Sequence, residues 1–295
     1  RCAPVHRGEK TMGLRGRVLA TLTLALTGVV APAAARAAPS ADVAALQVAL
    51  RARAAYGGTV DGVRGPATAA AVVAFQRRAG LAPDGIAGPL TRRALGWRGR
   101  HVYGSRSLRR GRRGWDVAAL QFKLAWHGFP SGPFDGVLGP RGASALARFQ
   151  RWAGLTPDAI AGPATFRALH RPPPVAPIAL RRPVPAPVGD GFGPRGGAFH
   201  AGLDFLSPYG APVRAAAGGV VTAAGFVAGG WGLRVAIDHG SCITTLYAHL
   251  SSAAVVPGQR VGTGSLIGRV GATGPHLHLE VLVCGANADP ARSLR

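Results

Sequence analysis

Apolar residues in the first half of the chain recur every three or four positions, the spacing of one face of a helix. Two stretches carry this pattern at a constant offset of 74 residues and align without a gap. Their opening triplets are Val43, Leu46 and Leu50, and Val117, Leu120 and Leu124. A repeat of this length indicates one supersecondary unit that occurs twice.

Each stretch predicts three short helices separated by loops. An Asp-Gly-Val-x-Gly-Pro loop follows the first helix, at residues 61–66 and again at 135–140. Proline fits the first turn of a helix, so the proline that closes each loop predicts the start of the second helix. In the first unit this helix is expected to bury Val72, Val73 and Phe75. The two units are expected at residues 38–97 and 114–170.

The pattern changes from about residue 188 onward. Short runs rich in valine, isoleucine and threonine replace the alanine-rich helical pattern, and glycine-rich turns separate them. The clearest runs are 219–222, 233–237 and 242–247. The chain is therefore predicted to be multidomain α plus β, with two small three-helix units followed by a mainly antiparallel β domain at 188–295.

Two connecting segments have unusual compositions. Residues 98–113 gather arginines, including Arg106, Arg109, Arg110, Arg112 and Arg113. Such a cluster can bind phosphate groups, or it can be a solvated connector, and the sequence leaves both interpretations open. Residues 171–187 are rich in proline, which predicts a stiff spacer that holds the next domain at a distance.

The charge of the chain narrows the class of partner. There are 35 Lys and Arg against 12 Asp and Glu, a formal net charge of +23 over 295 residues. The hydrophobic fraction of 47% excludes wholesale disorder. The basic excess indicates an anionic partner, which is nucleic acid, a membrane surface or an acidic cell wall.

Residues 12–37 match a secretory signal peptide. Its parts are Met12, the charged pair Arg15 and Arg17, an apolar run at 18–30 and the small-x-small site Ala35-Arg36-Ala37. The alternative is a membrane anchor, but the run is shorter than the about 20 residues that a span requires. Residues 1–11 are interpreted as upstream sequence. Removal of residues 1–37 would leave 29 basic and 11 acidic residues, a net charge of +18.

The C-terminal region concentrates histidines in tight patterns. His200 and Asp204 form H-x-x-x-D, and His276 and His278 form H-x-H. Alternate residues of a strand point to one face, so the last two histidines can face one site together with Glu280. Two imidazoles and a carboxylate are a ligand set of catalytic zinc, which leaves a fourth position for water. Glu280 is placed to orient a ligand from outside the metal's own coordination sphere.

The order of these patterns resembles the lysostaphin-like (LytM-type) zinc endopeptidases of bacterial cell walls. H-x-x-x-D, a Y-x-H-L motif that contains His249, and G-P-H-L-H-L-E follow one another between residues 200 and 280. The resemblance implies one Zn²⁺ per chain with His200, Asp204 and His278 as ligands. It also implies that His249 and His276 are the catalytic pair, which activates water and stabilises the developing oxyanion.

The two helical units resemble the peptidoglycan-binding domain found beside cell-wall hydrolases. The Asp-Gly-x-x-Gly-Pro loop recurs together with a Phe-Gln pair, which is Phe75-Gln76 in one unit and Phe149-Gln150 in the other. The resemblance covers residues 40–96 and 112–170, and it implies binding to the wall without catalysis.

One stretch departs from the peptidase pattern. The family usually has a longer run of Gly, Ser and Thr before G-P-H-L-H, whereas residues 268–274 are compressed here. Because this loop would lie beside the cleft, the substrate preference of the family is not carried over to this chain, whereas the expected metal ligands are unaffected.

Cys242 and Cys284 would remain after export, which permits disulfides, whereas Cys2 would be lost. Strand alternation alone does not bring the pair together, since Cys242 is out of phase with His249. A bulge or a turn at Gly240-Ser241 would rephase it. We predict a Cys242–Cys284 disulfide.

These patterns favour a secreted, zinc-dependent peptidoglycan endopeptidase that cleaves amide bonds in stem peptides or cross-bridges. The alternative is a catalytically inactive wall-binding protein or an activator of another hydrolase. Peptidoglycan is the expected partner, and anionic wall polymers are a further candidate for the arginine-rich segment. Nucleic acid is set aside because aromatic residues do not interleave with the arginines. We expect an extracellular or wall-associated monomer without a membrane span.

Overall fold

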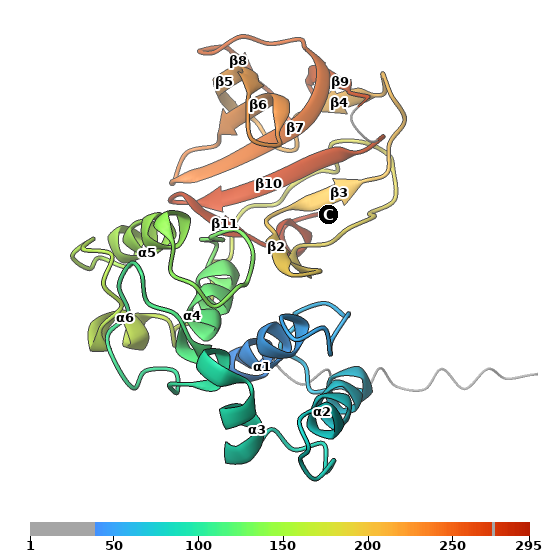
Figure 1. Cartoon of the computed structure of the whole chain (residues 1–295). Helices are drawn as coiled ribbons and strands as arrows, with labels where there is room; N and C mark the ends of the chain where they lie inside the picture. Colours follow the sequence, from blue (N-terminus) through green and yellow to red (C-terminus); the bar gives the residue numbers. More distant parts are fainter. Residues whose placement is uncertain (1–38, 273–274) are drawn as a thin grey trace, which may run out of the picture. The chain divides into compact units, whose positions relative to one another are not determined.

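The computed structural model describes residues 39–272 and 275–295, with helices in the first half of the chain and strands in the second (Figure 1). The predicted leader and the residues before it lie outside this range, as does the end of the compressed stretch at 268–274. Within the described part of the chain, no helix is long and apolar enough to cross a membrane. The predicted class, helical units followed by a mainly antiparallel β domain, is confirmed.

Each repeat folds into three helices. They are α1 (Ala41–Arg51), α2 (Pro66–Arg78) and α3 (Pro89–Ala94), then α4 (Trp115–Trp126), α5 (Pro140–Trp152) and α6 (Pro163–Ala168). A short 3₁₀ turn, η1 (Gly96–Gly99), follows α3. Proline occupies the first turn of α2, α3, α5 and α6, where its missing N–H has no partner to lose. Each helix start that we based on a loop proline is therefore correct.

A buried glutamine closes each loop that precedes a proline-initiated helix. The Nε2 atom of Gln47 donates to Asp61 Oδ1 at 2.7 Å, and the same atom of Gln76 donates to Asp84 Oδ1 at 2.7 Å. In the second repeat, Gln121 and Gln150 bind Asp135 and Asp158 in the same way, each at 2.8 Å. The unit of repetition is thus one helix with its loop, which occurs twice within each 74-residue repeat.

The two repeats share one hydrophobic cluster, and the second repeat adds a cluster of its own around Leu120, Leu146 and Phe149. Helices α1 and α4 pack against each other, and one cluster contains Leu46 and Leu50 of α1 together with Trp115 and Phe122 of α4. The indole N–H of Trp115 also donates to Asp42 at 2.9 Å. Val73, which we expected to be buried, is only half-buried, as is Val43 of α1. A shared core explains how such short helices bury enough apolar surface.

The second half of the chain forms antiparallel strands. They are β1 (Gly193–Arg195), β2 (Ala198–His200), β3 (Leu203–Phe205), β4 (Pro212–Arg214), β5 (Gly219–Val227), β6 (Gly232–Asp238), β7 (Ile243–Ala253), β8 (Arg260–Val261), β9 (Leu266–Val270), β10 (Leu277–Val283) and β11 (Ala286–Ala288). Strand β10 is central, since it pairs with β7 on one side and with β3 and β11 on the other. A 3₁₀ turn, η2 (Pro290–Arg292), ends the described structure.

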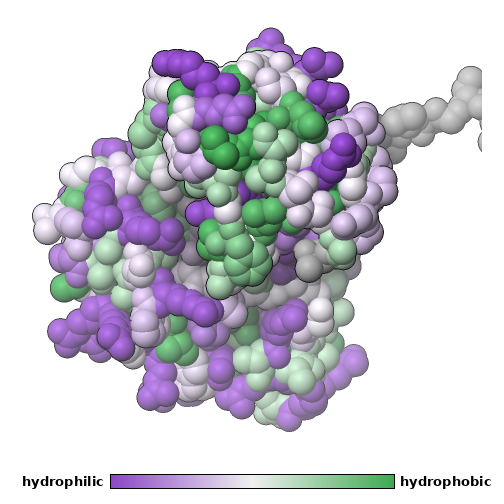
Figure 2. Space-filling model, turned by 90° about the horizontal axis from the view of Figure 1, so that it is seen from above, coloured by the Kyte–Doolittle hydropathy of each residue, from purple (hydrophilic) through white to green (hydrophobic). Residues whose placement is uncertain are grey.

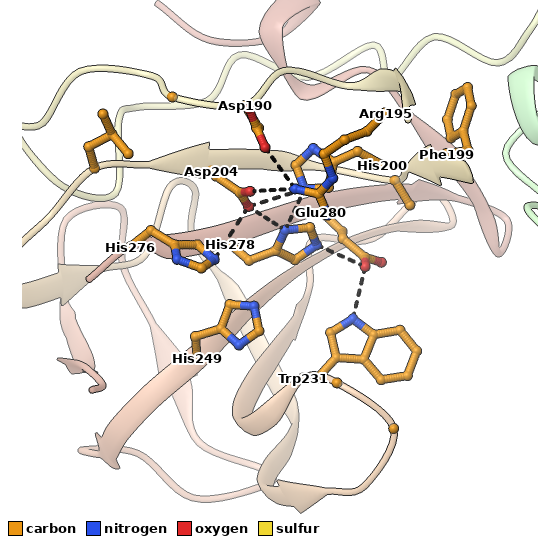
Figure 3. Close-up of a pocket in the computed structure, with 15 residues that line it drawn as sticks. Asp190, Arg195, Phe199, His200, Asp204, Trp231, His249, His276, His278 and Glu280 are labelled. Atoms are coloured by element: carbon orange, nitrogen blue, oxygen red, sulfur yellow. Dashed lines mark hydrogen bonds and ion pairs between the residues drawn. The ribbon is translucent and has the colours of Figure 1, made fainter. Parts of the chain in front are cut away.

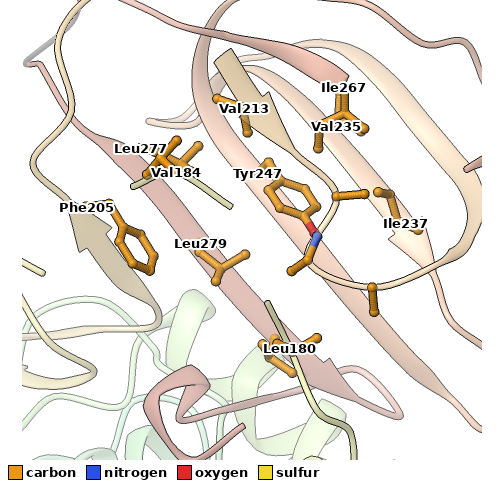
Figure 4. Packing of buried hydrophobic residues seen from close by; sticks show 14 of the residues in the cluster. Leu180, Val184, Phe205, Val213, Val235, Ile237, Tyr247, Ile267, Leu277 and Leu279 are labelled. Carbon is orange, nitrogen blue, oxygen red and sulfur yellow. The ribbon is translucent and has the colours of Figure 1, made fainter. Parts of the chain in front are cut away.

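One face of this sheet forms the hydrophobic core (Figure 4). Leu277 and Leu279 of β10 point into it together with Tyr247 of β7, and all three are fully buried. The Tyr247 hydroxyl accepts a hydrogen bond from the Ala216 amide at 2.7 Å, so the phenol oxygen is satisfied within the core. The other face of β10 is left for its polar residues.

The proline-rich segment is not the free spacer that we predicted. Leu180 and Val184 are each 1% exposed and belong to the core of the sheet (Figure 4). The Leu180 amide donates to Ser293 O at 2.8 Å, and the Arg214 amide donates to Pro183 O at 2.9 Å. Proline removes N–H donors but leaves carbonyls and apolar side chains, which this segment uses to cover the sheet.

The surface combines polar and apolar side chains. Figure 2, which views the molecule of Figure 1 from above, shows green hydrophobic residues among purple hydrophilic ones. The large apolar side chains of the sheet region that are more than half exposed are Leu206, Tyr209, Phe226 and Val256.

Candidate active site

The polar face of strand β10 supplies the centre of the candidate site. Along β10, Leu277 and Leu279 enter the core, while His278 and Glu280 point to the opposite face. The antiparallel register places Asp204 of β3 directly beside His278. His200 ends β2 four residues before Asp204. In Figure 3 these side chains and two further imidazoles, those of His249 and His276, face one another.

Three acceptor atoms converge in this cluster. Asp204 Oδ1 lies 2.8 Å from His278 Nδ1 and 3.1 Å from His200 Nε2. The two ring nitrogens are 3.0 Å apart. All three residues are buried, and they are the one group of potential metal ligands found in the described part of the chain.

The outer nitrogen of each imidazole fixes the tautomer of the ring. His200 Nδ1 lies 2.8 Å from the carbonyl oxygen of Gly191, which can only accept, so this nitrogen carries the proton. His278 Nε2 lies 3.1 Å from Glu280 Oε1 and donates to that carboxylate. The inner nitrogens therefore present lone pairs to the same point as the Asp204 oxygen.

The geometry of these lone pairs fits a divalent metal. Ligand bonds of about 2.0–2.1 Å in a tetrahedron separate neighbouring ligand atoms by roughly 3.3 Å. The observed separations of 2.8, 3.0 and 3.1 Å are close to this value. Three converging acceptors without a proton between them repel one another, and a cation removes that repulsion.

The same cluster shifts the pKa values of its members when it holds no metal. Burial opposes the charged form of His278, but hydrogen bonds to Asp204 and Glu280 outweigh it and raise the pKa of His278 to about 9. Burial likewise raises the pKa of Asp204, and the two histidines reverse this and hold that pKa well below its usual range. A proton would thus occupy the place that suits a cation.

Two residues outside the sequence motifs, Trp231 and Asn287, donate hydrogen bonds to Glu280. The indole N–H of Trp231 donates to Glu280 Oε1 at 2.9 Å, and the side-chain amide of Asn287 donates to Oε2 at 2.8 Å. Trp231 also accepts a hydrogen bond from the His249 amide at 3.0 Å through its carbonyl oxygen. The turn between β5 and β6 therefore supports both His249 and, through Glu280, the ring of His278.

Arg195 contacts the outer oxygen of Asp204. Its Nη1 atom lies 3.2 Å from Asp204 Oδ2 and 2.9 Å from Asp190 Oδ2, while the arginine side chain is 55% exposed. The guanidinium can thus orient the carboxylate and still face the cleft. Arg195 was visible in the sequence only as part of a Phe-Gly-Pro-Arg string, which gave no reason to assign it a role.

His249 adopts a backbone conformation that is rare for a non-glycine residue. Its φ is +61°, within strand β7, where the pairing with β6 and with β9 is irregular. Such a conformation is typical of functional sites. It directs the imidazole to the site, with ring centroids 4.7 Å from His276 and 5.8 Å from His278. Burial, then the neighbouring imidazoles, lower the pKa of His249, which favours its neutral form.

The cluster lies at the base of a cleft of about 830 Å³. The cleft is bordered by the residues just described and by Phe199, Leu206 and the glycines Gly229 and Gly230. Gly202 is required between the two ligand positions of the H-x-x-x-D motif, because a Cβ there would lie 2.8 Å from the His278 ring and would clash with the Leu279 carbonyl. The site thus combines a cluster of three potential metal ligands, two further imidazoles and an open cleft.

Cys242 and Cys284 are joined as a disulfide, with Cα atoms 4.7 Å apart. Both cysteines lie just outside paired strands, Cys242 before β7 and Cys284 after β10. Each has a positive φ, so strand alternation does not govern their directions. This answers the phase problem that the sequence left open.

Comparison with known families agrees with this geometry. The model of peptidase family M23 matches residues 198–290, and the peptidoglycan binding domain model matches residues 39–95 and 113–169. These ranges contain the sheet with its histidine cluster and the two helical repeats.

Curated relatives match the sheet region. The DD-carboxypeptidase/endopeptidase Mpg of Neisseria meningitidis is 45% identical over 96 residues, which is 31% of this chain and 22% of that protein. The peptidoglycan DD-endopeptidase ShyC of Vibrio cholerae is 40% identical over 95 residues, again 31% of this chain and 22% of that protein. The match thus spans about a fifth of the length of these relatives.

Among solved structures, the catalytic domain of lysostaphin from Staphylococcus simulans is 31% identical, with a TM-score of 0.35. The match covers 36% of this chain and 90% of that one. By the two family models, the chain combines a domain of peptidase family M23 over residues 198–290 with two domains of the peptidoglycan-binding family over residues 39–95 and 113–169.

Proposed function

We propose that this protein is a secreted, zinc-dependent peptidoglycan endopeptidase. Its substrates would be amide bonds in stem peptides or cross-bridges of the bacterial cell wall. The observation that carries the proposal is the convergence of three potential ligand atoms, from His200, Asp204 and His278, beside two imidazoles in an open cleft. A buried set of this kind has little structural use without a cation.

Zinc is the metal that fits best, because two imidazoles and one carboxylate leave a fourth position open. When bound, it would supply an activated water and polarise the substrate carbonyl. Glu280 would keep the lone pair of His278 Nδ1 directed at the ion, and Arg195 would do the same for the Asp204 carboxylate.

The remaining two histidines would handle protons. His249, whose lowered pKa keeps it neutral at neutral pH, would accept the proton of the attacking water. His276 borders the cleft and would donate a hydrogen bond to the carbonyl oxygen as negative charge develops there. The water oxygen bonds to the carbonyl carbon, the C–N bond breaks, and the proton passes to the leaving amine.

The helical domains would keep the enzyme on its polymeric substrate. We place them at residues 38–97 and 114–170, with a leader at 12–37 that directs the chain out of the cell. The peptidase domain from 188 onward is completed by the proline-rich segment before it, which supplies Leu180 and Val184 to its core. Two linked binding domains raise the effective concentration of the catalytic site near the wall.

The test uses purified protein without residues 1–37 on isolated peptidoglycan. We expect soluble peptides whose masses identify the cleaved bond, loss of release with a chelator, and recovery with added Zn²⁺. His278→Ala should abolish release, whereas His170→Ala, a change of an exposed histidine in the helical region, should not. Full hydrolysis by the His278→Ala variant would overturn the mechanism.

The alternative is a wall-binding protein that activates another hydrolase. It predicts that the protein sediments with peptidoglycan, contains no zinc by elemental analysis and releases no peptides. The complete ligand cluster favours the enzyme.

A further inference from the structure

The arginine-rich segment before α4 is an ordered part of the helical region. Residues 98–113 contain seven arginines and no carboxylate side chain. Leu108 is fully buried, and it exchanges two backbone hydrogen bonds with Ala161, at 3.0 and 2.8 Å. Gly111 and Arg112 make two more with Leu138, at 2.9 and 2.8 Å. A loop fixed at these points holds its arginines in defined places.

The segment encloses a small basic pocket. Its volume is about 260 Å³, and it is lined by Trp97, Arg100, His101, Arg106, Gly111, Arg112 and Arg113. We call it the arginine pocket. Every charged side chain in its lining is basic. Two lining residues, Arg106 and Trp97, already have partners within the protein.

Arg106 is occupied as a structural support. Its guanidinium forms an ion pair with the fully buried carboxylate of Asp116 at 2.7 Å, and it also donates to Arg113 O at 2.9 Å. The charge of Asp116 is therefore already balanced by an arginine of the pocket. Trp97 is covered in turn, since the Arg98 guanidinium lies 4.0 Å from its ring centroid. Its aromatic face is not free to stack on a sugar.

The guanidinium groups of Arg100 and Arg112 have no such partners, and that of Arg113 has only a stacking contact, 5.8 Å from the Trp97 ring centroid. All three are exposed, and in the part of the chain that the structure describes none of them forms an ion pair or a side-chain hydrogen bond. Like charges held around one cavity repel one another, and an anion that binds there relieves this repulsion. A solvated connector would not need to hold them together.

We infer that the arginine pocket binds a phosphate group of an anionic wall polymer. Guanidinium groups that approach from three positions of a loop suit the tetrahedral set of phosphate oxygens. A planar carboxylate is satisfied by a single bidentate arginine. The pocket lies outside the peptidase domain, so this inference depends on neither the metal centre nor amide hydrolysis.

The test measures the affinity of the full chain without residues 1–37 for a poly(glycerol phosphate) oligomer by calorimetry. In the pocket variant, Arg100→Gln, Arg112→Gln and Arg113→Gln are combined. The control variant combines Arg64→Gln, Arg77→Gln and Arg167→Gln, which removes the same charge from exposed sites elsewhere in the helical region. We expect the pocket variant to bind about tenfold more weakly and the control to stay near the parent.

Two more measurements separate phosphate recognition from general basicity. Replacement of Arg112 and Arg113 by lysine keeps the charge but removes the planar fork, and it should give an intermediate loss. A polyglutamate oligomer of equal charge should bind more weakly than the phosphate polymer. Equal losses in the pocket and control variants, equal binding of polyglutamate, or tighter binding of duplex DNA of equal charge would each overturn the assignment. The unfolding midpoint in urea shows that each variant is folded.

Discussion

At the scale of single residues, the side chain held by the most partners beside the three potential metal ligands is Glu280. It is buried, its two oxygens accept from Trp231 and Asn287, and it accepts from His278 Nε2 as well. Burial raises the pKa of Glu280, but these partners outweigh burial and lower it, so the group is a carboxylate at neutral pH. In the proposed metal site, its charge would polarise the His278 ring toward the ion.

Glu280→Gln is therefore expected to weaken zinc affinity by about 10- to 100-fold. The amide keeps the shape of the side chain but loses the charge. Competition with a chromogenic chelator measures the affinity directly. Asp238→Asn, a change of an exposed carboxylate on β6, is the matched control and should bind zinc like the parent. Unchanged affinity in Glu280→Gln would show that Glu280 only fills space.

Tyr247 gives a stability prediction at the same scale. Burial raises the pKa of Tyr247 to about 12, so the phenol remains neutral, and its oxygen accepts from the Ala216 amide. Tyr247→Phe leaves that amide buried without a partner, which should reduce the free energy of unfolding by about 1–3 kcal/mol. Urea denaturation measures it. Tyr209→Phe, at a 66% exposed position, should change it by less than about 0.5 kcal/mol.

The sequence predicted some residues of the site and missed others. Motif spacing pointed to His200, Asp204, His249, His276 and His278, and strand alternation placed Glu280 on the face of His278. Trp231 gave no signal, because it lies 49 positions from its partner Glu280 in the sequence and meets it only after β5 to β10 have assembled. Asn287 was missed for a related reason, since β11 has only three residues.

At the scale of elements, loop chemistry decided what could be predicted. The helix starts followed from Gly-Pro pairs, and β5, β6 and β7 followed from runs of β-branched residues. The short strands β8 and β11 could not be predicted, because two or three residues carry no periodicity and are ordered by long-range pairing. The core role of the proline-rich segment could not be predicted either, because its composition is that of a spacer.

The repeat loops predict a response to acid. Backbone hydrogen bonds from Ile86 and Ile160, then side-chain bonds from Gln76 and Gln150, lower the pKa values of Asp84 and Asp158 in the folded state. Depressed folded-state pKa values stabilise the fold above the unfolded value of 3.8, and this stabilisation is lost as the pH falls below it.

In the double variant Asp84→Asn and Asp158→Asn, the free energy of unfolding should therefore fall less steeply than in the parent between about pH 5 and pH 2. Urea midpoints measured across this range provide the comparison. Asp238→Asn, outside the repeats, should leave the slope as it is in the parent. A double variant with the parent's slope would mean that these loops open before acid unfolds the domain.

The disulfide joins the ends of two paired strands, β7 and β10, across a separation of 42 residues. Loop entropy gives a stabilisation of about 4 kcal/mol for a closure of this length. Replacing Cys242 and Cys284 with serine should reduce the free energy of unfolding by roughly that amount. Titration of the unreduced protein without its leader should find no free thiol, and two free thiols would contradict the pairing.

At the scale of the whole molecule, binding and chemistry should respond differently to salt. The chain without residues 1–37 carries 29 basic and 11 acidic residues, whereas the three potential metal ligands are buried. Salt screens exposed charges over about 10 Å at 0.1 M and about 3 Å at 1 M, and it screens buried groups much less.

Raising the salt from 0.1 to 1 M should therefore reduce the amount of protein that sediments with peptidoglycan. The turnover of a small soluble cross-linked peptide should change much less. Both are measured on one preparation, with zinc held constant. A parallel loss of turnover would indicate that substrate capture at the cleft is itself electrostatic.

The burial of Leu180 and Val184 under the sheet has a practical consequence for isolating the catalytic unit. A fragment that begins at residue 188, where the strand pattern begins, would lack the proline-rich segment and expose the apolar side chains that this segment covers. A fragment that begins near residue 172 keeps the segment. When the sheet domain is transferred to another protein, in the laboratory or in evolution, the proline-rich segment would have to be transferred with it.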